Sequence, residues 1–325
     1  MTHALITGGA GFIGSHLTEL LLSKGYTVTV IDNLSTGQIK NLDGVAEHPH
    51  LRIAIEDIRN ANVMDRLVSE CDLIFHLAAA VGVQRIIQEP IETIETNIGG
   101  TEVVLKTARR YRKKVLIAST SEVYGKGVRI PFTEEDDSLL GATTRSRWSY
   151  AASKAIDEFL ALAYHRQVDL PVVIFRLFNT VGPRQSGQYG MVLPRFAKWA
   201  LKNEPIMVYG DGTQQRCFCN VNNVVHAIYA LSTSSEALGE VVNIGSSEEV
   251  SILQLAERVK ARAGSTSEIK CIPYEEAYET GFEDFRRRVP SLDKIARLTN
   301  WQPTTTLDET IDQILDYQRK EMANV

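Results

Sequence analysis

Two pairs of residues in this chain have side chains that could carry out acid–base chemistry together. Tyr150 and Lys154 stand four residues apart at the start of a segment with a helical pattern, so they share one helix face. The ammonium group there can lower the pKa of the phenol, and a phenolate can remove the proton of an alcohol while a hydride leaves the same carbon. In the stretch ASTSEVYG (118–125), Thr120 offers a hydrogen bond to the same oxygen and Glu122 offers a second acid or base. We predict that these four residues are catalytic.

A glycine-rich turn near the start of the chain predicts where the hydride acceptor would bind. The strand-like run ALIT is followed by GGAGFIG (8–14), which opens a helix. Glycines allow a tight turn and a close approach to a pyrophosphate, and the helix start offers free N–H groups to the anion. Asp32 ends the next strand and can accept both ribose hydroxyls while repelling a 2′-phosphate, which favours NAD over NADP; alternatively, it could cap a helix. The cofactor contacts predicted from this region are Gly8, Gly11, Phe12, Ile13, Gly14, Asp32, Asn33, Asp57 and Ile58, together with Tyr150 and Lys154.

The elements that would position these residues alternate between apolar strands and helices. Near-continuous apolar runs predict strands buried on both faces of a parallel sheet at 3–7, 27–32, 51–57, 72–78, 114–120 and 171–178. Helical patterns lie between them at 12–25, 62–70, 97–113 and 150–167. This order predicts an α/β fold with a doubly wound parallel sheet of the Rossmann type, whose chemistry lies at the carboxyl ends of the strands.

The alternation breaks at about Gly182, where turn-forming residues become frequent. We therefore predict a cofactor-binding domain at 1–180 and a smaller C-terminal α/β lobe at 181–325 that binds the substrate. The two parts are expected to be interleaved, so this boundary is approximate.

Composition disfavours several classes of partner. The 325 residues carry a formal net charge of −5, with acids and bases interspersed, which gives no basic footprint for nucleic acid. No run approaches the ~18 apolar residues of a membrane span, and the start has no basic leader, so we expect a cytoplasmic protein with no membrane partner. The four cysteines are scattered in a pattern that fits neither a zinc site nor a redox motif, so we predict no metal.

Motifs along nearly the whole chain resemble a known family. They are TGGAGFIG, Asp32, HLAA (76–79), STSEVYG, YAASK, RLFNTVGPR (176–184), YGDGTQQRCF (209–218) and NIGSS (243–247). This set is similar to the extended short-chain dehydrogenases/reductases that modify nucleotide sugars. The resemblance implies tightly held NAD, transient oxidation at sugar carbon 4, a C-terminal lobe that binds the nucleotide diphosphate, and further cofactor contacts at Leu77, Ala78 and Ala79. It also implies a homodimer formed through a four-helix bundle of 99–113 and 150–165.

Finer features resemble the enzymes that act on acid sugars. Thr120-Ser121-Glu122 is similar to the Thr-Ser-Glu of UDP-glucuronate decarboxylases, although GDP-mannose 4,6-dehydratases also carry it. SRWSYAASK (146–154), QQRCF (214–218) and GFEDFRRRVPS (281–291) resemble the bacterial UDP-4-amino-arabinose pathway decarboxylase and UDP-apiose/xylose synthase. We therefore expect a lyase that decarboxylates UDP-glucuronate to a UDP-pentose. The alternatives are a UDP-glucose or UDP-glucuronate 4-epimerase, an NDP-hexose 4,6-dehydratase, and a catalytically silent NAD sensor, against which the intact Thr120, Tyr150 and Lys154 speak.

The acid-sugar interpretation makes specific demands on polar side chains. A uronate oxidised at carbon 4 is a β-keto acid that loses carbon dioxide readily, and Glu122 would manage the proton at carbon 5. The chain departs from the decarboxylases at AVGVQRIIQEP (80–90), where Arg85 stands and a tyrosine is absent. Arg85 could hold a carboxylate or be a solvated surface charge. The predicted substrate contacts are Arg85, Ser121, Asn179, Arg184, Arg195, Arg216 and Arg288. Of these, Arg184 and Arg288 are expected at the diphosphate, and Arg216 at the diphosphate or the substrate carboxylate.

Overall fold

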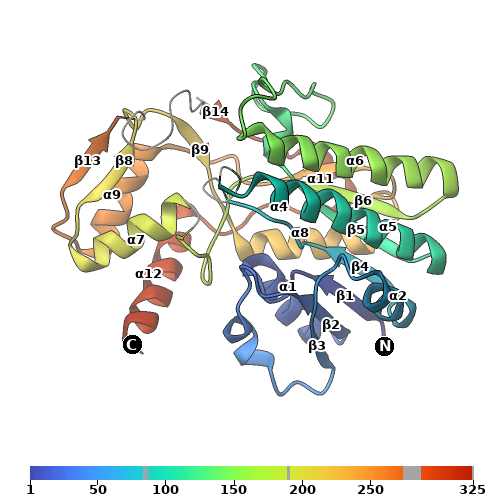
Figure 1. Ribbon diagram of the computed structural model, residues 1–325. Helices are drawn as coiled ribbons and strands as arrows, with labels where there is room; N and C mark the ends of the chain where they lie inside the picture. The colour runs from blue at the N-terminus through green and yellow to red at the C-terminus, as the bar shows by residue number, and fades with distance from the viewer. Residues whose placement is uncertain (83–85, 87, 189–190, 274–286, 324–325) are drawn as a thin grey trace.

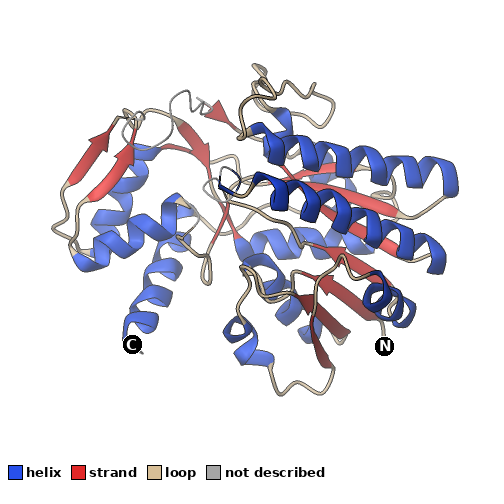
Figure 2. Ribbon diagram, viewed as in Figure 1, coloured by secondary structure: helices blue, strands red, loops and turns tan. Residues whose placement is uncertain are grey.

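The computed structural model describes residues 1–82, 86, 88–188, 191–273 and 287–323, and a seven-stranded parallel sheet forms its centre (Figure 2). The strand order is β11-β6-β5-β4-β1-β2-β3. The order reverses between β1 and β4, which is the doubly wound arrangement, so the predicted fold class is confirmed. The strands are β1 (His3–Thr7), β2 (Thr27–Asp32), β3 (Leu51–Ile55), β4 (Leu73–His76), β5 (Lys114–Thr120), β6 (Val172–Leu177) and β11 (Val241–Ile244).

Helices cover both faces of this sheet, which explains why most of its strands are apolar on both faces. Because successive side chains of a strand point to opposite faces, Ala4 and Ile6 join one core cluster and Leu5 joins the other. The first face is covered by α1 (Phe12–Ser23), α8 (Val221–Thr233) and α11 (Asp293–Thr299). The second face is covered by α2 (Ala61–Glu70), α5 (Gly100–Tyr111) and α6 (Trp148–Val168).

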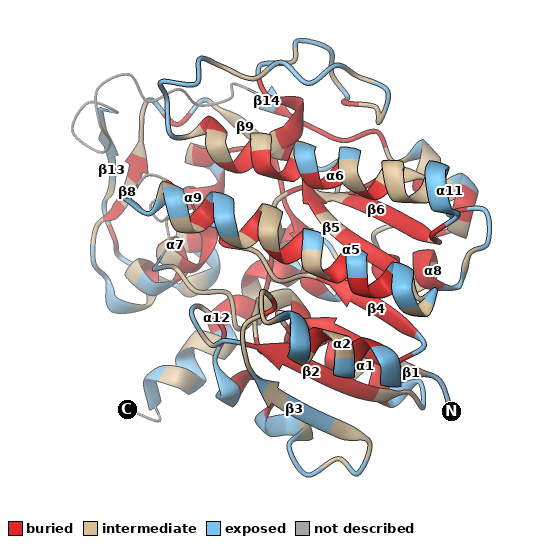
Figure 3. Ribbon diagram, turned by 45° about the vertical axis from the view of Figure 1, so that its right-hand side comes forward, coloured by how far each residue is buried: buried red, intermediate tan, exposed pale blue. Residues whose placement is uncertain are grey.

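Strand β3 differs from the prediction of burial on both faces. It pairs only with β2 at the sheet edge, and its side chains Ile53 and Ile55 are 40% and 64% exposed. Figure 3 shows β3 in the colours of intermediate and exposed residues beside the buried central strands. The apolar run was correctly assigned to a strand. Its place at the edge of the sheet, however, leaves side chains such as Ile53 and Ile55 without covering residues.

A smaller part of the chain packs beside the sheet and has its own apolar core (Figure 1, left). It holds the helices α7 (Val192–Lys202), α9 (Ile252–Ala263) and α12 (Leu307–Ala323). Its strands are β7 (Thr180–Val181), β8 (Ile206–Tyr209), β9 (Gln215–Cys217), β10 (Cys219–Asn220), β12 (Glu249–Ser251), β13 (Ile269–Ile272) and β14 (Arg287–Arg288). Between these elements, α8 and β11 return to the first part of the fold, so the division at 180/181 stays an approximate prediction.

Four short helical pieces complete the described chain. They are α4 (Pro90–Ile94), the 3-10 helices η1 (Ile39–Val45) and η3 (Ser121–Tyr124), and the π-helical turn η2 (Glu95–Gly99). Along the described residues, none of the helices has the length and apolarity needed to cross a membrane.

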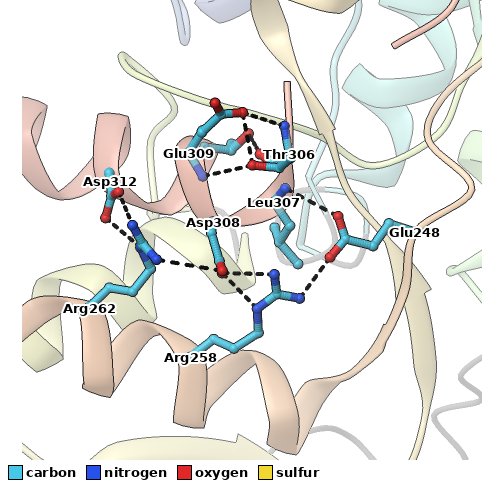
Figure 4. Close-up of polar contacts among 9 residues, drawn as sticks. Glu248, Arg258, Arg262, Thr306, Leu307, Asp308, Glu309 and Asp312 are labelled. Atoms are coloured by element: carbon cyan, nitrogen blue, oxygen red, sulfur yellow. Dashed lines mark hydrogen bonds and ion pairs between the residues drawn. The ribbon is translucent and has the colours of Figure 1, made fainter. Parts of the chain in front are cut away.

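Ion pairs align α12 with α9 in the smaller part (Figure 4). The Arg258 guanidinium donates to Asp308 and to Glu248, each at 2.8 Å, and Arg262 pairs with Asp312. Half-exposed pairs of this kind contribute only about 0–1 kcal/mol each. The buried side chains of α12, among them Ile311 and Ile314, therefore contribute most of its stability, and the ion pairs fix its register.

A buried and an exposed isoleucine of the sheet make a matched stability test. Ile117→Ala in β5 removes a fully buried side chain and should lower the free energy of unfolding by about 2–5 kcal/mol. Ile55→Ala, the same change on the exposed edge strand, should alter it by no more than about 0.5 kcal/mol. Urea unfolding of both variants measures the difference. Equal losses would contradict the burial pattern described above.

Candidate active site

A cleft with about 500 Å³ of space lies along the carboxyl ends of the sheet strands. Residues that end or follow five strands line it: Gly8 after β1, Asp32 in β2, Leu77 after β4, Thr120 in β5 and Phe178 after β6. Residues of the smaller part, such as Val192 at the start of α7, line its other side. The cleft is thus placed where open α/β sheets bind their ligands.

The glycine-rich turn has the close packing that a dinucleotide site requires. A Cβ added at Gly14 would lie 2.1 Å from the carbonyl oxygen of Gly8, so only glycine lets α1 approach this turn. Gly8 itself has a φ of +71°, which favours glycine. The first turn of α1 carries no acidic residue, and no side chain caps it. Its N–H groups and positive dipole end therefore suit a pyrophosphate, and the residues present fit the predicted cofactor.

Asp32 is held at the end of β2 by backbone donors. Its Oδ2 accepts from the N–H of Ala10 at 3.0 Å and its Oδ1 from the N–H of Leu34 at 2.9 Å. Burial raises the pKa of this carboxyl, although the backbone donors counter the effect. The Asp32 side chain both closes a turn and lines the cleft. Asn33, Asp57 and Ile58 line the cleft as well. Asp57 pairs with Arg59 at 2.8 Å, and its carboxylate accepts from Asn33 at 3.2 Å.

Tyr150 and Lys154 both lie in α6 and are buried. Burial raises the pKa of the Tyr150 phenol strongly, and the charges of Glu122 and Asp157 add to this, while a hydrogen bond with Thr120 opposes it. The Lys154 ammonium donates to Asp157 Oδ2 at 2.8 Å. The lowering of the phenol pKa by Lys154 stays a prediction, whereas the predicted partnership of Tyr150 with Thr120 is present.

Glu122 lies between two arginines. Arg288 forms an ion pair with its Oε1, and Arg147 Nη2 lies 3.4 Å from its Oε2. Burial alone would raise the pKa of Glu122, but the charges of Arg288, Arg147 and Arg216 lower it. Arg147 was missed by the sequence reasoning, although it stands within SRWSYAASK, three residues before Tyr150 and so on the same helical face.

Three other predicted substrate residues lie at the cleft. Asn179 Oδ1 accepts from Arg288 Nη2 at 3.0 Å, which places Asn179, Arg288 and Glu122 in one row. Ser121 lines the cleft beside them. Arg184 also lines it, but its guanidinium pairs with Glu19 of α1 at 2.5 Å, so it faces the glycine turn.

The remaining predicted substrate residues lie elsewhere or cannot be placed. Arg195 lines a separate hollow, where it stacks against the rings of Trp199 and Tyr209 at 4.8 and 5.0 Å. Arg216 is buried in β9, and its Nη1 donates to the carbonyl of Gln215 at 2.8 Å. Its charge nevertheless acts on Glu122. Arg85 lies outside the described residues.

Asn97 is a buried polar residue that sequence reasoning did not identify. It lies in the π-helical turn η2, a feature often found at functional sites. Its Oδ1 accepts from the N–H of Ala80 at 2.8 Å and its Nδ2 donates to Ser153 Oγ at 3.1 Å. Asn97 thus ties the loop after β4, which includes the predicted cofactor contacts Ala78 and Ala79, to helix α6. The sequence pattern carried no signal for the extra residue in this turn.

A profile of the GDP-mannose 4,6 dehydratase family matches residues 5–314. The chain belongs to this family. Its membership confirms the predicted resemblance to enzymes that modify nucleotide sugars.

Relatives of this member of the GDP-mannose 4,6 dehydratase family include two decarboxylases and an epimerase. It is 43% identical to the UDP-N-acetyl-alpha-D-glucosaminuronate decarboxylase of Bacillus cytotoxicus over 97% of both chains. It is 36% identical to UDP-glucuronic acid decarboxylase 1 of Xenopus tropicalis, over 98% of this chain and 72% of the relative. The UDP-glucuronic acid 4-epimerase of Bacillus cereus, solved with UDP-glucuronic acid and NAD, superimposes with a TM-score of 0.89 at 27% identity over 98% and 100% of the two chains.

The position of Asp32 makes a binding prediction for this family member. Asp32→Ala should weaken the binding of NAD by about 10–100-fold, because hydrogen bonds to a charged group are lost. It should also reduce the discrimination against NADP, since the repelling charge is gone. Calorimetric titration with both dinucleotides measures the two effects, and Asp43→Ala in the neighbouring η1 is the control. Unchanged NAD affinity would show that Asp32 only holds the turn.

Proposed function

We propose that this chain is an NAD-dependent decarboxylase of UDP-hexuronates, with UDP-glucuronate as the first candidate substrate. One observation carries the proposal: the carboxylate of Glu122 faces two guanidinium groups, those of Arg147 and Arg288, beside Tyr150. The three side chains are largely buried and line the cleft, and guanidinium groups bind carboxylates through paired hydrogen bonds. Such a place suits the carboxylate of an acid sugar.

The reaction divides among the residues at the strand ends. Tyr150 takes the proton of the carbon 4 hydroxyl, with Thr120 hydrogen-bonded to the same oxygen. NAD bound at the glycine turn would accept the hydride of carbon 4 and return it at the end of the cycle. The resulting β-keto acid breaks the bond between carbon 5 and the carboxylate. Carbon dioxide leaves, and the bonding electrons move to the ketone oxygen as an enolate.

Glu122 is assigned to the proton that carbon 5 then receives. Its lowered pKa keeps it ionised at neutral pH, so it must first take up a proton from solvent. The substrate carboxylate competes with Glu122 for Arg147 and Arg288, and this competition raises the pKa of Glu122 in the complex. Binding of an acid sugar thereby prepares the acid that completes the reaction.

A second candidate substrate is UDP-N-acetylglucosaminuronate. The 43% identity to the Bacillus cytotoxicus decarboxylase over 97% of both chains favours it. The two substrates differ at carbon 2, so the chemistry at carbons 4 and 5 is the same. A 4-epimerase and a 4,6-dehydratase remain the alternative reactions, because the fold is shared with the Bacillus cereus 4-epimerase and the family profile is named for a dehydratase.

Product analysis separates these reactions. The purified protein is incubated with UDP-glucuronate, UDP-N-acetylglucosaminuronate, UDP-glucose, GDP-mannose and dTDP-glucose, and carbon dioxide release and product mass are measured. Decarboxylation of either uronate supports the proposal and names the substrate. A product of unchanged mass would establish an epimerase, and loss of water would establish a dehydratase.

Two variants should fail at different steps of the proposed reaction. Tyr150→Phe should form no NADH in a single turnover, because the hydroxyl proton has no acceptor. Glu122→Gln should still form enzyme-bound NADH but slow product formation by about 10²–10⁴-fold, since a positioned acid is lost. Rapid-mixing absorbance and quenched product assays measure the two steps. Tyr111→Phe and Glu102→Gln, on α5 and remote from the cleft, are the matched controls. Product formation by Glu122→Gln at the wild-type rate would remove the proton role from Glu122.

The protein is further proposed to form a homodimer through α4 and α6. Val104, Leu105 and Ala108 of α5, which contributed to this expectation, are buried against the sheet. Phe159 and Ile156 of α6 are 74% and 46% exposed, however, and Ile91 of α4 is 72% exposed. An apolar face of this kind on adjacent helices fits a second copy of the chain. The cytoplasmic location stays a prediction from the sequence.

A charge on this face tests the dimer. Phe159→Glu should convert the dimer to a monomer at micromolar concentration, because two glutamates would meet in an apolar contact. Light scattering measures the mass. Val128→Glu, at a position 91% exposed on a loop outside these helices, is the control and should stay dimeric. A wild-type monomer would overturn the proposal.

A further inference from the structure

A second buried charge stands behind the Tyr150–Lys154 pair. Asp157 lies three residues after Lys154 in α6, and the side chains of the two are 1% and 2% exposed. The Lys154 ammonium donates to Asp157 Oδ2 at 2.8 Å. Removing either member would leave an uncompensated charge in the protein interior, which is strongly unfavourable. The two residues therefore act as one unit.

A chain of hydrogen bonds connects this unit to the cofactor turn. Thr7 Oγ1 accepts from the N–H of Ala78 at 3.1 Å and lies 2.8 Å from His76 Nδ1. Burial lowers the pKa of His76 to about 3, so the ring is neutral. Its Nε2 lies 3.0 Å from Thr101 Oγ1, so the ring bridges Thr7 and Thr101.

Asp157 stands at the end of this series. Burial raises the pKa of its carboxyl, and the charge of Lys154 and a hydrogen bond from Thr101 oppose that effect. Lys154 and Thr101 thus favour the charged form of Asp157 in a buried place that disfavours it.

We propose that Asp157 is a positioning residue for the oxidation step: it holds the Lys154 ammonium in place and offsets its charge, and thereby sets how readily Tyr150 loses its proton. This inference deepens the proposed function, in which Tyr150 is the base. An ammonium acting alone would favour the phenolate, whereas an ammonium paired with a carboxylate acts only weakly on it. The pairing thus makes Tyr150 a stronger base that ionises at higher pH.

Other charges near this part of α6 have partners of their own. Glu122 faces Tyr150 from η3, with Arg147 and Arg288 around it, and Glu158 is paired with Arg176 of β6. The charge of Glu122 raises the pKa of Tyr150 and that of Arg288 lowers it. Neutral His76 contributes no charge. Asp157 is therefore the group whose change alters the balance at Tyr150 without touching the Glu122 cluster.

Direct titration tests the proposal without any substrate. The protein with bound NAD is labelled with ¹³C at the tyrosine ring carbon that bears oxygen, and the Tyr150 signal is assigned by its loss in Tyr150→Phe. Asp157→Asn should shift the titration of this signal to lower pH, because the positive charge of Lys154 is no longer offset. Asp157→Glu keeps the carboxylate and should return the titration toward the wild type. A Tyr150 titration that is unchanged, or higher, in Asp157→Asn overturns the proposal.

Single-turnover kinetics provide a second readout. The pH dependence of NADH formation from UDP-glucuronate should move in the same direction in Asp157→Asn, with Glu102→Gln of α5 as a remote control that does not move. If Asp157→Asn does not fold, Asp157→Ala carries the same expectation, since alanine suits a helix and removes the same charge. A shifted titration with no NADH formed in the wild type would contradict the proposed function and leave the role of Asp157 standing. If the wild type and Asp157→Asn both form NADH with the same pH dependence, only the role of Asp157 is contradicted.

Discussion

The cleft depends on one constraint of the sheet: parallel strands that are covered on both faces leave room for polar groups only where they end. Gly8, Asp32 and Thr120 stand at the carboxyl ends of β1, β2 and β5, and all three line the cleft. In the middle of a strand, between the two covered faces, the polar atoms of these residues would each need a partner within the protein. At the carboxyl ends of the strands, the same atoms can bind the ligand instead. The packing that stabilises the sheet therefore also places the polar residues of the site along one edge of it.

Buried ion pairs then fix helix α6 against this edge. Arg176 of β6 donates to Glu158 through Nη2 at 2.7 Å and through Nε at 3.0 Å, a two-point contact that sets both the height and the rotation of the helix. Lys154–Asp157 is a second buried pair within α6, and Glu122–Arg288 joins η3 to β14. Buried pairs add little net stability because desolvation opposes their attraction, but a partner out of place is costly. In this protein they specify where Tyr150 stands.

The surroundings of the cleft shift the pKa values of two acidic groups in opposite directions. Burial raises the pKa of Tyr150, whereas three arginines lower that of Glu122, although the two groups lie in one cleft. At neutral pH without substrate, Tyr150 therefore keeps its proton and Glu122 is ionised, which is the reverse of the states that the proposed reaction uses. Substrate binding is the event that would bring the two pKa values closer, because a carboxylate at Arg147 and Arg288 weakens the hold of these arginines on Glu122.

The sequence by itself determined the parts of the site that follow one another along the chain. GGAGFIG, the Asp32 strand end, Thr120-Ser121-Glu122 and the spacing of Tyr150 and Lys154 are local patterns, and a local pattern needs only its own strand or helix to be placed correctly. Tertiary structure alone decided which charges meet. Arg288 reaches Glu122 across 166 residues, Arg184 turns to Glu19 of α1, and Arg195 lies outside the cleft. Burial of Asp157 behind Lys154 and exposure of Ile55 at the sheet edge likewise depend on neighbours far along the chain. The sequence does not show which partner a charged side chain will have. Desolvation and Coulomb attraction depend on burial and distances that exist only once the chain has folded.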